Sequence, residues 1–245
     1  MEDLKLGTPE VTTQILQRDR YAEVICALAN LASSIDKFST EIRNLQRTEI
    51  DETREPFDFK TQIGSSAMPH KMNPRISENI SSIAKIVRSL VQPSLESVVT
   101  WHERDLTQSA AERFTIPEAF ILTDHILVGI NNVLSGLQVS PARMQRNLEL
   151  TGGMELSEAL VGALVRKGMG RTKAFKLIRS IAIDTITHGG MFSDLVRKNT
   201  AVGKLLSQDE LRTVLDPKHY LGKTKDLIQG AVSKTRQERG ARGLG

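Results

Sequence analysis

The first long stretch of the chain carries apolar residues at intervals that alternate between three and four. These positions are Tyr21, Val24, Leu28, Leu31, Ile35, Phe38, Ile42 and Leu45. Such spacing places them on one stripe of an α-helix, as in a heptad repeat. Upstream, Thr8 and Pro9 resemble an N-cap and first-turn pair. The pattern therefore predicts one long helix that begins near residue 8 and continues to residue 45.

Two later stretches repeat this pattern. The first contains Ile76, Ile80, Ile83, Val87 and Leu90, and the second contains Ile116, Phe120, Thr123, Leu127, Ile130, Leu134 and Leu137. Long helices with narrow apolar stripes need partners of similar length to cover them. We therefore predict an elongated helical bundle that other subunits complete.

The pattern changes near Ser140 and Pro141, where shorter helices with clear boundary signals begin. The signals are Ser140–Pro141 as N-cap and N1, Thr172 as a cap for the run that ends at Gly189–Gly190, Ser207 with Glu210 as a capping box, and Thr224 opening a last helix. No strand-like alternation stands out. We predict an all-α fold with a long-helix bundle over 1–139 and a smaller helical C-terminal domain over 140–245.

Composition limits the class of protein and the cellular compartment that we expect. The 245 residues are 39% hydrophobic and 25% charged, which is typical of soluble globular proteins. Cys26 is the only cysteine, so an internal disulfide is excluded and a reducing compartment is favoured. The acidic start of the chain does not resemble a signal peptide, and no apolar run is long enough for a bilayer. We expect a cytoplasmic protein without a membrane partner.

The net charge of +4 arises largely from a basic tail after residue 233. Such a tail is typical of a solvated chain end, and it leaves nucleic-acid binding as a minor alternative. A basic chain is also compatible with a small anionic substrate.

The most unusual segment, residues 64–79, reads G-S-S-A-M-P-H-K-M-N-P-R-I-S-E-N. Gly64 is a candidate hinge, and Asn73–Pro74 is a strong helix start in which Asn73 caps. A helix N-terminus and Lys71 facing the same space would bind an anion, in particular a carboxylate. The alternative is an ordinary surface connector with a normal cap.

The string G-S-S-A-M-P-H-K-M-N-P resembles the signature of the fumarase/aspartase lyase superfamily. Three further segments, residues 13–20, 101–113 and 216–222, are similar to those of the adenylosuccinate lyases within it. The resemblance covers essentially the whole chain. It implies β-elimination of a C–N bond, releasing fumarate from adenylosuccinate to give AMP and from SAICAR to give AICAR.

The resemblance also assigns roles to individual residues. Those implied in catalysis are Ser65 as general base, Lys71 as a carboxylate ligand and Glu78 as the residue that orients the acid histidine. Those implied in substrate binding are Gln14, Asn73, Asn79, Arg104, Ser109 and Arg113, with the last three around the nucleotide phosphate. Without the resemblance, Arg104 and Arg113 would be interpreted as surface ion-pair partners of Glu103 or Glu112.

None of the five histidines matches the general acid of the family. The chain resembles the C-terminal portion of these enzymes, which are homotetramers whose active sites combine three subunits. We therefore expect this polypeptide to be inactive alone. No metal-ligand cluster or glycine-rich phosphate loop stands out, so neither a metal nor an organic cofactor is expected.

Three alternatives remain open beside this interpretation. One is a carboxymuconate cycloisomerase-like member of the same superfamily. The second is a non-catalytic helical assembly module that retains the signature, and the third is a basic nucleic-acid-binding module. The segment 101–113 favours a nucleotide substrate, since a phosphate site with two arginines has no use for a purely dicarboxylate substrate.

Overall fold

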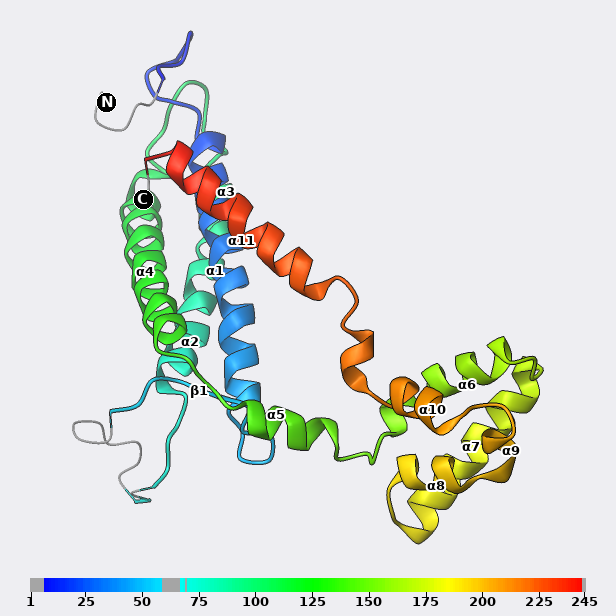
Figure 1. Cartoon of the computed structure of the whole chain (residues 1–245). Helices are drawn as coiled ribbons and strands as arrows, with labels where there is room; N and C mark the ends of the chain where they lie inside the picture. Colours follow the sequence, from blue (N-terminus) through cyan, green and yellow to red (C-terminus); the bar gives the residue numbers. More distant parts are fainter. Residues whose placement is uncertain (1–6, 59–66, 69, 244–245) are drawn as a thin grey trace. The chain divides into compact units, whose positions relative to one another are not determined.

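The computed structural model of the chain describes residues 7–58, 67–68 and 70–243. Helices dominate these residues, with two strands of only two residues each (Figure 1). The predicted all-α fold is therefore confirmed. The chain divides into two compact units, residues 1–144 and 145–245, and each has its own hydrophobic core.

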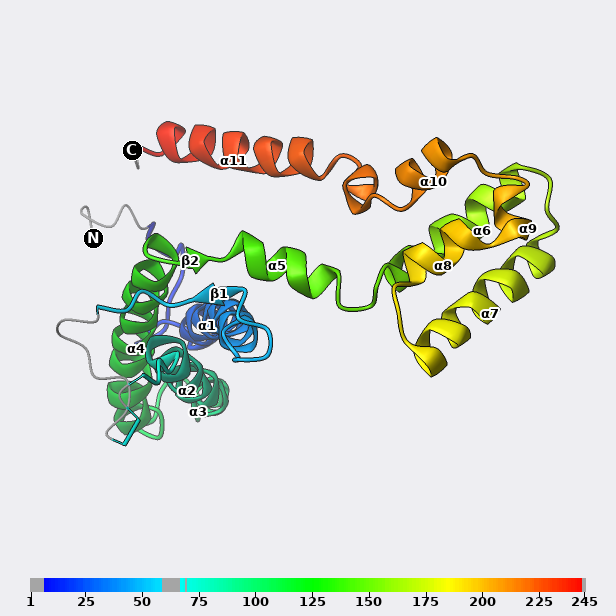
Figure 2. The same ribbon diagram turned by 60° about the horizontal axis from the view of Figure 1, so that its bottom comes forward.

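Three long helices form the N-terminal unit. Its elements are α1 (Asp19–Leu45), β1 (Thr53–Arg54), α2 (Arg75–Ser89), α3 (Val91–Glu96), α4 (Ser109–Ser135) and β2 (Gln138–Val139), and α5 (Pro141–Leu148) crosses the division between the units. Helices α1, α2 and α4 pack against one another (Figures 1 and 2). Arg18 pairs with Glu112 at 2.7 Å, so α1 and α4 begin at the same end of the bundle. Helix α2 begins at the opposite end, where Gln46 contacts Met72.

Only part of the heptad stripe of α1 packs inside this chain, since Ile35 and Ile42 are buried and other members of the stripe are exposed. The buried positions of α1 are Ala22, Ile25, Ala29, Ala32, Ile35, Ser39 and Ile42. Val24, Leu31 and Phe38, which are seven residues apart, are exposed, Phe38 to 59%. Helix α4 likewise exposes Phe120, Leu127 and Leu134 at the same interval. Two apolar stripes with coiled-coil spacing therefore remain uncovered in a single chain.

The prediction that α1 begins near Thr8 and Pro9 is wrong, since the helix begins at Asp19. The residues just before it include β-branched Val11, Thr12 and Thr13, which have low helix propensity. Thr13 Oγ1 also lies within hydrogen-bonding distance of the carbonyl oxygens of Ile15 and Glu103. These local and long-range contacts hold the segment in a non-helical conformation.

A two-residue antiparallel pairing joins the chain after α1 to the chain after α4. Thr53 lies opposite Val139, and the amide of Ser140 donates to the carbonyl of Glu52 at 2.9 Å. Strands of this length are too short for an alternating pattern, which is why none stood out in the sequence. The pairing fixes the start of the segment that leads to α2.

Shorter helices form the C-terminal unit. They are η2 (Met154–Leu156), α6 (Ser157–Arg166), α7 (Arg171–His188), α8 (Phe192–Lys198), α9 (Thr200–Gly203), α10 (Gln208–Val214), η3 (Pro217–Tyr220) and α11 (Thr224–Ala241). The capping box of Ser207 and Glu210 is confirmed. The cap predicted at Thr172 is wrong, because the N-cap of α7 is Gly170, two residues earlier, where the backbone is extended. No helix within the described part of the chain is long and apolar enough to cross a membrane.

Candidate active site

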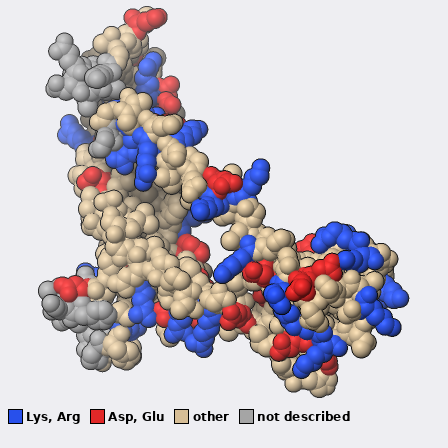
Figure 3. All heavy atoms as spheres, viewed as in Figure 1, with Lys and Arg blue, Asp and Glu red and all other residues tan. Residues whose placement is uncertain are grey.

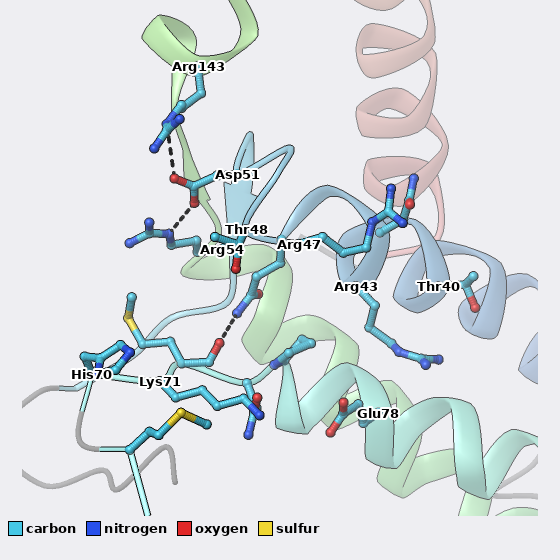
Figure 4. A pocket seen from close by; sticks show the side chains of 16 residues that line it. Thr40, Arg43, Arg47, Thr48, Asp51, Arg54, His70, Lys71, Glu78 and Arg143 are labelled. Carbon is cyan, nitrogen blue, oxygen red and sulfur yellow. Dashed lines mark hydrogen bonds and ion pairs between the residues drawn. The ribbon is translucent and has the colours of Figure 1, made fainter. Parts of the chain in front are cut away.

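An open cavity of about 880 Å³ lies at the end of the bundle where α1 stops and α2 starts (Figure 4). The segment before α2 contributes Lys71 and Asn73 to its lining, and the first turn of α2 contributes Glu78. Three predicted site residues therefore line one cavity. The predicted base, Ser65, lies outside the described residues.

The cavity is predominantly basic. Its charged lining side chains are Arg43, Arg47, Arg54, Lys71, Arg143, Asp51 and Glu78, a net charge of +3 with His70 neutral. Arg43 comes from α1 and Arg47 from the turn that follows it, whereas Lys71 comes from the segment before α2 and Glu78 from α2 itself (Figure 4). A concave surface of one charge sign concentrates ligands of the opposite sign. The cavity is therefore suited to a small ligand with more than one negative charge.

Asp51 organises one wall of the cavity. Its carboxylate contacts Arg54 at 2.7 Å and Arg143 at 3.2 Å (Figure 4). The hydrogen bond from Arg54 is the main cause that lowers the pKa of Asp51 below its usual 3.8. The backbone of Asp51 has φ of 54°, a left-handed conformation that Asp and Asn tolerate better than most residues.

Asp51→Asn isolates the charge of this residue, since Asn accepts the same backbone conformation. A lowered pKa means that the carboxylate stabilises the fold above the unfolded-state pKa of about 3.9, and that this contribution is lost as pH falls through the lowered value. We expect a loss of about 1 kcal/mol in unfolding free energy at pH 7 that shrinks toward pH 3. Urea denaturation at both pH values measures it. Asp124→Asn, at an exposed position of α4, is the matched control, and an equal loss at both pH values would contradict the ionic explanation.

The N-terminus of α2 differs from the sequence prediction. The residue at the N-cap position is Pro74, and it makes no side-chain capping bond, so the cap predicted at Asn73 is wrong. Instead, Glu55 accepts the backbone N–H groups of Ile76 at 3.1 Å and Ser77 at 2.6 Å. These donors are therefore occupied by a carboxylate of the chain itself. The predicted anion site at this helix end is already filled.

Asn79 is close in sequence to the cavity residues but does not line the cavity. Its side-chain oxygen lies 3.0 Å from Nε2 of His125 on α4. One residue of separation rotates a helical side chain by about 100°, which places Asn79 and Glu78 on different faces of α2. The structure thus separates these two predicted residues.

The remaining predicted residues lie at the opposite end of the bundle. Gln14 precedes α1, Arg104 lies in the loop before α4, Ser109 is the first residue of α4, and Arg113 follows one turn later. Asp105 holds the Arg104 loop, accepting hydrogen bonds from Trp101 and Thr107, which lower its pKa.

The two arginines at this end are exposed. Glu112 pairs with Arg18 rather than with Arg113, and no ion pair of Arg104 or Arg113 is found among the residues that the structure describes. The interpretation as surface ion pairs is therefore wrong for these two side chains.

The length of α1 separates the two groups of predicted residues. Its 27 residues correspond to about 40 Å of helix at 1.5 Å per residue. Gln14 and Arg104 lie near its beginning, and Lys71 and Glu78 lie near its end. The two groups of predicted residues in a single chain are therefore too far apart to contact the same small molecule.

Across residues 7–58, 67–68 and 70–243, no group of three or more His, Cys, Asp or Glu side chains is placed to hold a metal ion.

Comparison with known proteins identifies the family. A family model described as "Lyase" matches residues 1–88, and one described as "Adenylosuccinate lyase C-terminus" matches residues 153–231. The chain is 43% identical over 236 residues to adenylosuccinate lyase of Methanothermobacter thermautotrophicus, covering 96% of the chain and 53% of that relative. It is 44% identical over 244 residues to adenylosuccinate lyase of Pyrococcus abyssi, covering 100% of the chain and 54% of the relative. The chain belongs to the adenylosuccinate lyase family.

Solved structures show the same fold. A 3-carboxy-cis,cis-muconate lactonizing enzyme from Pseudomonas putida matches with a TM-score of 0.84 at 33% identity, over 96% of this chain and 51% of that one. A fumarate lyase from Mesorhizobium sp. BNC1 matches with a TM-score of 0.82 at 28% identity, over 95% and 51%. The chain thus spans about half the length of its adenylosuccinate lyase relatives and of these structures.

Proposed function

We propose that this chain provides part of the active site of an adenylosuccinate lyase, which releases fumarate from adenylosuccinate and from SAICAR. The observation that carries the proposal is the basic cavity that Lys71, Asn73 and Glu78 line. Family membership supplies the reaction type, and the cavity has the charge that a succinyl group with two carboxylates requires.

In the proposed reaction, Ser65 removes the proton from the carbon next to a substrate carboxylate. The electron pair left on that carbon forms the double bond of fumarate, and the C–N bond breaks toward the nitrogen. Negative charge collects on the carboxylate before the bond breaks, so preorganised donors that bind it lower the barrier. Lys71 and Asn73 are the donors that we assign to this task. Because Glu55 occupies the backbone N–H groups of Ile76 and Ser77, these two donors do not bind the substrate, and we assign the stabilisation to side chains.

The departing nitrogen takes its proton from a histidine that this chain does not supply. His70 lines the cavity, but the resemblance to the family gives it no role. Glu78 lines the cavity, and we assign it the task of orienting an imidazole that arrives from outside the chain. On this proposal the chain is inactive unless polypeptide bearing that histidine joins it.

The phosphate is bound by the opposite end of the bundle. Arg104, Ser109 and Arg113 present two cations and a hydroxyl group, a combination suited to phosphate oxygens. The two half-sites are separated by a helix of about 40 Å, which is much longer than a succinylated nucleotide. One substrate molecule is therefore bound by half-sites from different copies of the chain.

Exposed apolar stripes support an assembly of several copies. The stripe of α1 comprises Val24, Leu31 and Phe38, and that of α4 comprises Phe120, Leu127 and Leu134. Figure 3 shows a broad area of the N-terminal unit with few charged side chains. Heptad spacing on two long helices fits a bundle of helices from several subunits. We propose a homotetramer for the complete enzyme.

A second candidate function is that of a carboxymuconate cycloisomerase. It is favoured by the match to the Pseudomonas putida lactonizing enzyme at 33% identity. Its substrate carries carboxylates but no phosphate, so Arg104 and Arg113 would have no partner in that reaction.

Substrate tests on a reconstituted enzyme separate these proposals. We define the reconstituted enzyme as this chain combined with the part of the Methanothermobacter relative that the chain does not match. We expect fumarate release from adenylosuccinate by the reconstituted enzyme, none from the chain alone, and no turnover of carboxymuconate. Turnover of carboxymuconate instead, or of neither substrate, would contradict the proposed function.

Arg104→Met and Arg113→Met test the phosphate half-site. Each is expected to raise KM for adenylosuccinate by roughly 10- to 100-fold, because a charge-assisted hydrogen bond to phosphate is lost. The nucleoside succinyladenosine, which lacks the phosphate, provides the control, and its kcat/KM should change less than about twofold. Equal losses on both substrates would assign these arginines another role.

A further inference from the structure

Glu55 is a buried acidic residue for which the proposed reaction has no use. It is only 5% exposed and directly follows β1. Its two carboxylate oxygens accept the backbone N–H groups of Ile76 at 3.1 Å and Ser77 at 2.6 Å. A carboxylate is stable in a buried position when charged donors or N–H groups form hydrogen bonds to its oxygens. The positive end of a helix dipole stabilises it further. Glu55 therefore caps α2 from a distance of more than twenty residues along the chain.

Gln46 completes the arrangement from the end of α1. Its Nε2 donates to the carbonyl oxygen of Met72 at 3.1 Å, and its Oε1 accepts the backbone N–H of Glu55 at 2.9 Å. The four hydrogen bonds connect α1, the end of β1, the residue after Lys71 and the first turn of α2. Both ends of the chain segment from Glu55 to Ser77 are thereby held together at Gln46, the residue that follows α1.

This arrangement fixes the direction of the cavity residues. Lys71 immediately precedes Met72, and Glu78 immediately follows Ser77. Both neighbours are held through backbone groups, so Lys71 and Glu78 project from anchored positions into the same cavity. Catalytic groups need to be held within a fraction of an ångström for full effect.

We propose that Glu55 is a positioning residue of the active site, acting with Gln46 to hold Lys71, Asn73 and Glu78 toward the cavity. The inference deepens the proposed function and rests on it. Glu55 does not contact the substrate. It excludes substrate carboxylates from the N–H groups of Ile76 and Ser77, and it fastens the side chains that bind them instead.

Glu55→Gln is the most direct test. The amide has one acceptor oxygen, and its NH₂ group would face a second N–H donor, so one of the two capping bonds is lost. We expect backbone hydrogen exchange at Ile76 and Ser77 in this chain to become at least about tenfold faster. Glu41→Gln, which removes the charge of an exposed glutamate on α1, should leave both rates unchanged. Unchanged exchange in Glu55→Gln would overturn the capping role.

A methionine methyl signal tests positioning separately from stability. Met72 lines the cavity, whereas Met154 packs against the core of the other unit. With ¹³C-methyl methionine, we expect the Met72 signal of Glu55→Gln to move toward the position of unfolded methionine while the Met154 signal stays in place. A mere loss of stability would leave the native Met72 signal where it is, and that result would overturn the positioning role.

Gln46→Leu provides a second variant if Glu55→Gln does not fold. It removes the bonds to Met72 and Glu55 and keeps the size of the side chain roughly constant. The same displacement of the Met72 signal is expected. In the reconstituted enzyme, both variants should lower kcat about 10- to 100-fold with a smaller change in KM. Displaced signals with unchanged kcat would overturn the catalytic relevance of the positioning, whereas an inactive wild-type enzyme would count against the proposed function alone.

Discussion

Ser65→Ala is expected to lower kcat of the reconstituted enzyme by a factor of about 10⁴ or more. Removal of the hydroxyl group leaves no base at the position that we assign to proton abstraction, while the groups that bind the substrate remain. KM and nucleotide binding should therefore change little. The comparison is made on adenylosuccinate, with fumarate release as the signal.

Ser66→Ala is the matched control, because it removes the same hydroxyl group one residue further along. A loss of less than about tenfold is expected there, as for a residue outside the reaction coordinate. Near-normal kcat in Ser65→Ala would contradict the assigned base. A large loss in Ser66→Ala with little in Ser65→Ala would move the role to the neighbouring serine.

The helices could be predicted from the sequence because apolar spacing depends only on local order along the chain. The three long runs correspond to α1, α2 and α4. The face of α1 that packs inside the chain could be predicted only in part. Ile35 and Ile42 of the predicted stripe are buried in it, but so are the small residues Ala22, Ala29 and Ala32, which give no apolar pattern. The larger Leu31 and Phe38 gave the stronger pattern, and they are exposed. A heptad stripe predicts a helical partner without saying which chain supplies it.

The cavity could be predicted only in part, for a similar reason. Lys71 and Glu78 carry a signal because they belong to a dense local motif. Glu55 and Gln46 carry none, because they lie nine residues apart and their partners before and in α2 are 21 to 26 residues away in sequence. Arg43, which also lines the cavity, is one of many cations on a helix. Its position at the cavity depends on which residues surround it after folding and not on its neighbours in the sequence.

The two half-sites of one chain lie too far apart to serve one substrate molecule, and this separation allows defective copies to complement each other. Lys71→Met damages the carboxylate half-site, and Arg104→Met damages the phosphate half-site. Each variant alone is expected to lose most activity at low substrate concentration. Copies that carry different defects can still combine one intact half-site of each kind.

The decisive measurement is the activity of assemblies that contain both variants. The two variant chains are expressed together with different affinity tags. They are combined with the part of the Methanothermobacter relative that completes the reconstituted enzyme, and the assemblies are purified over both tags. Random pairing predicts that about a quarter of the sites receive two intact halves, so kcat/KM should recover to about that fraction of wild type. A double variant, Lys71→Met with Arg104→Met, mixed with itself controls for residual activity. Activity in the mixed assembly that stays at the level of the single variants would show that each site takes both halves from one chain, and would contradict the account.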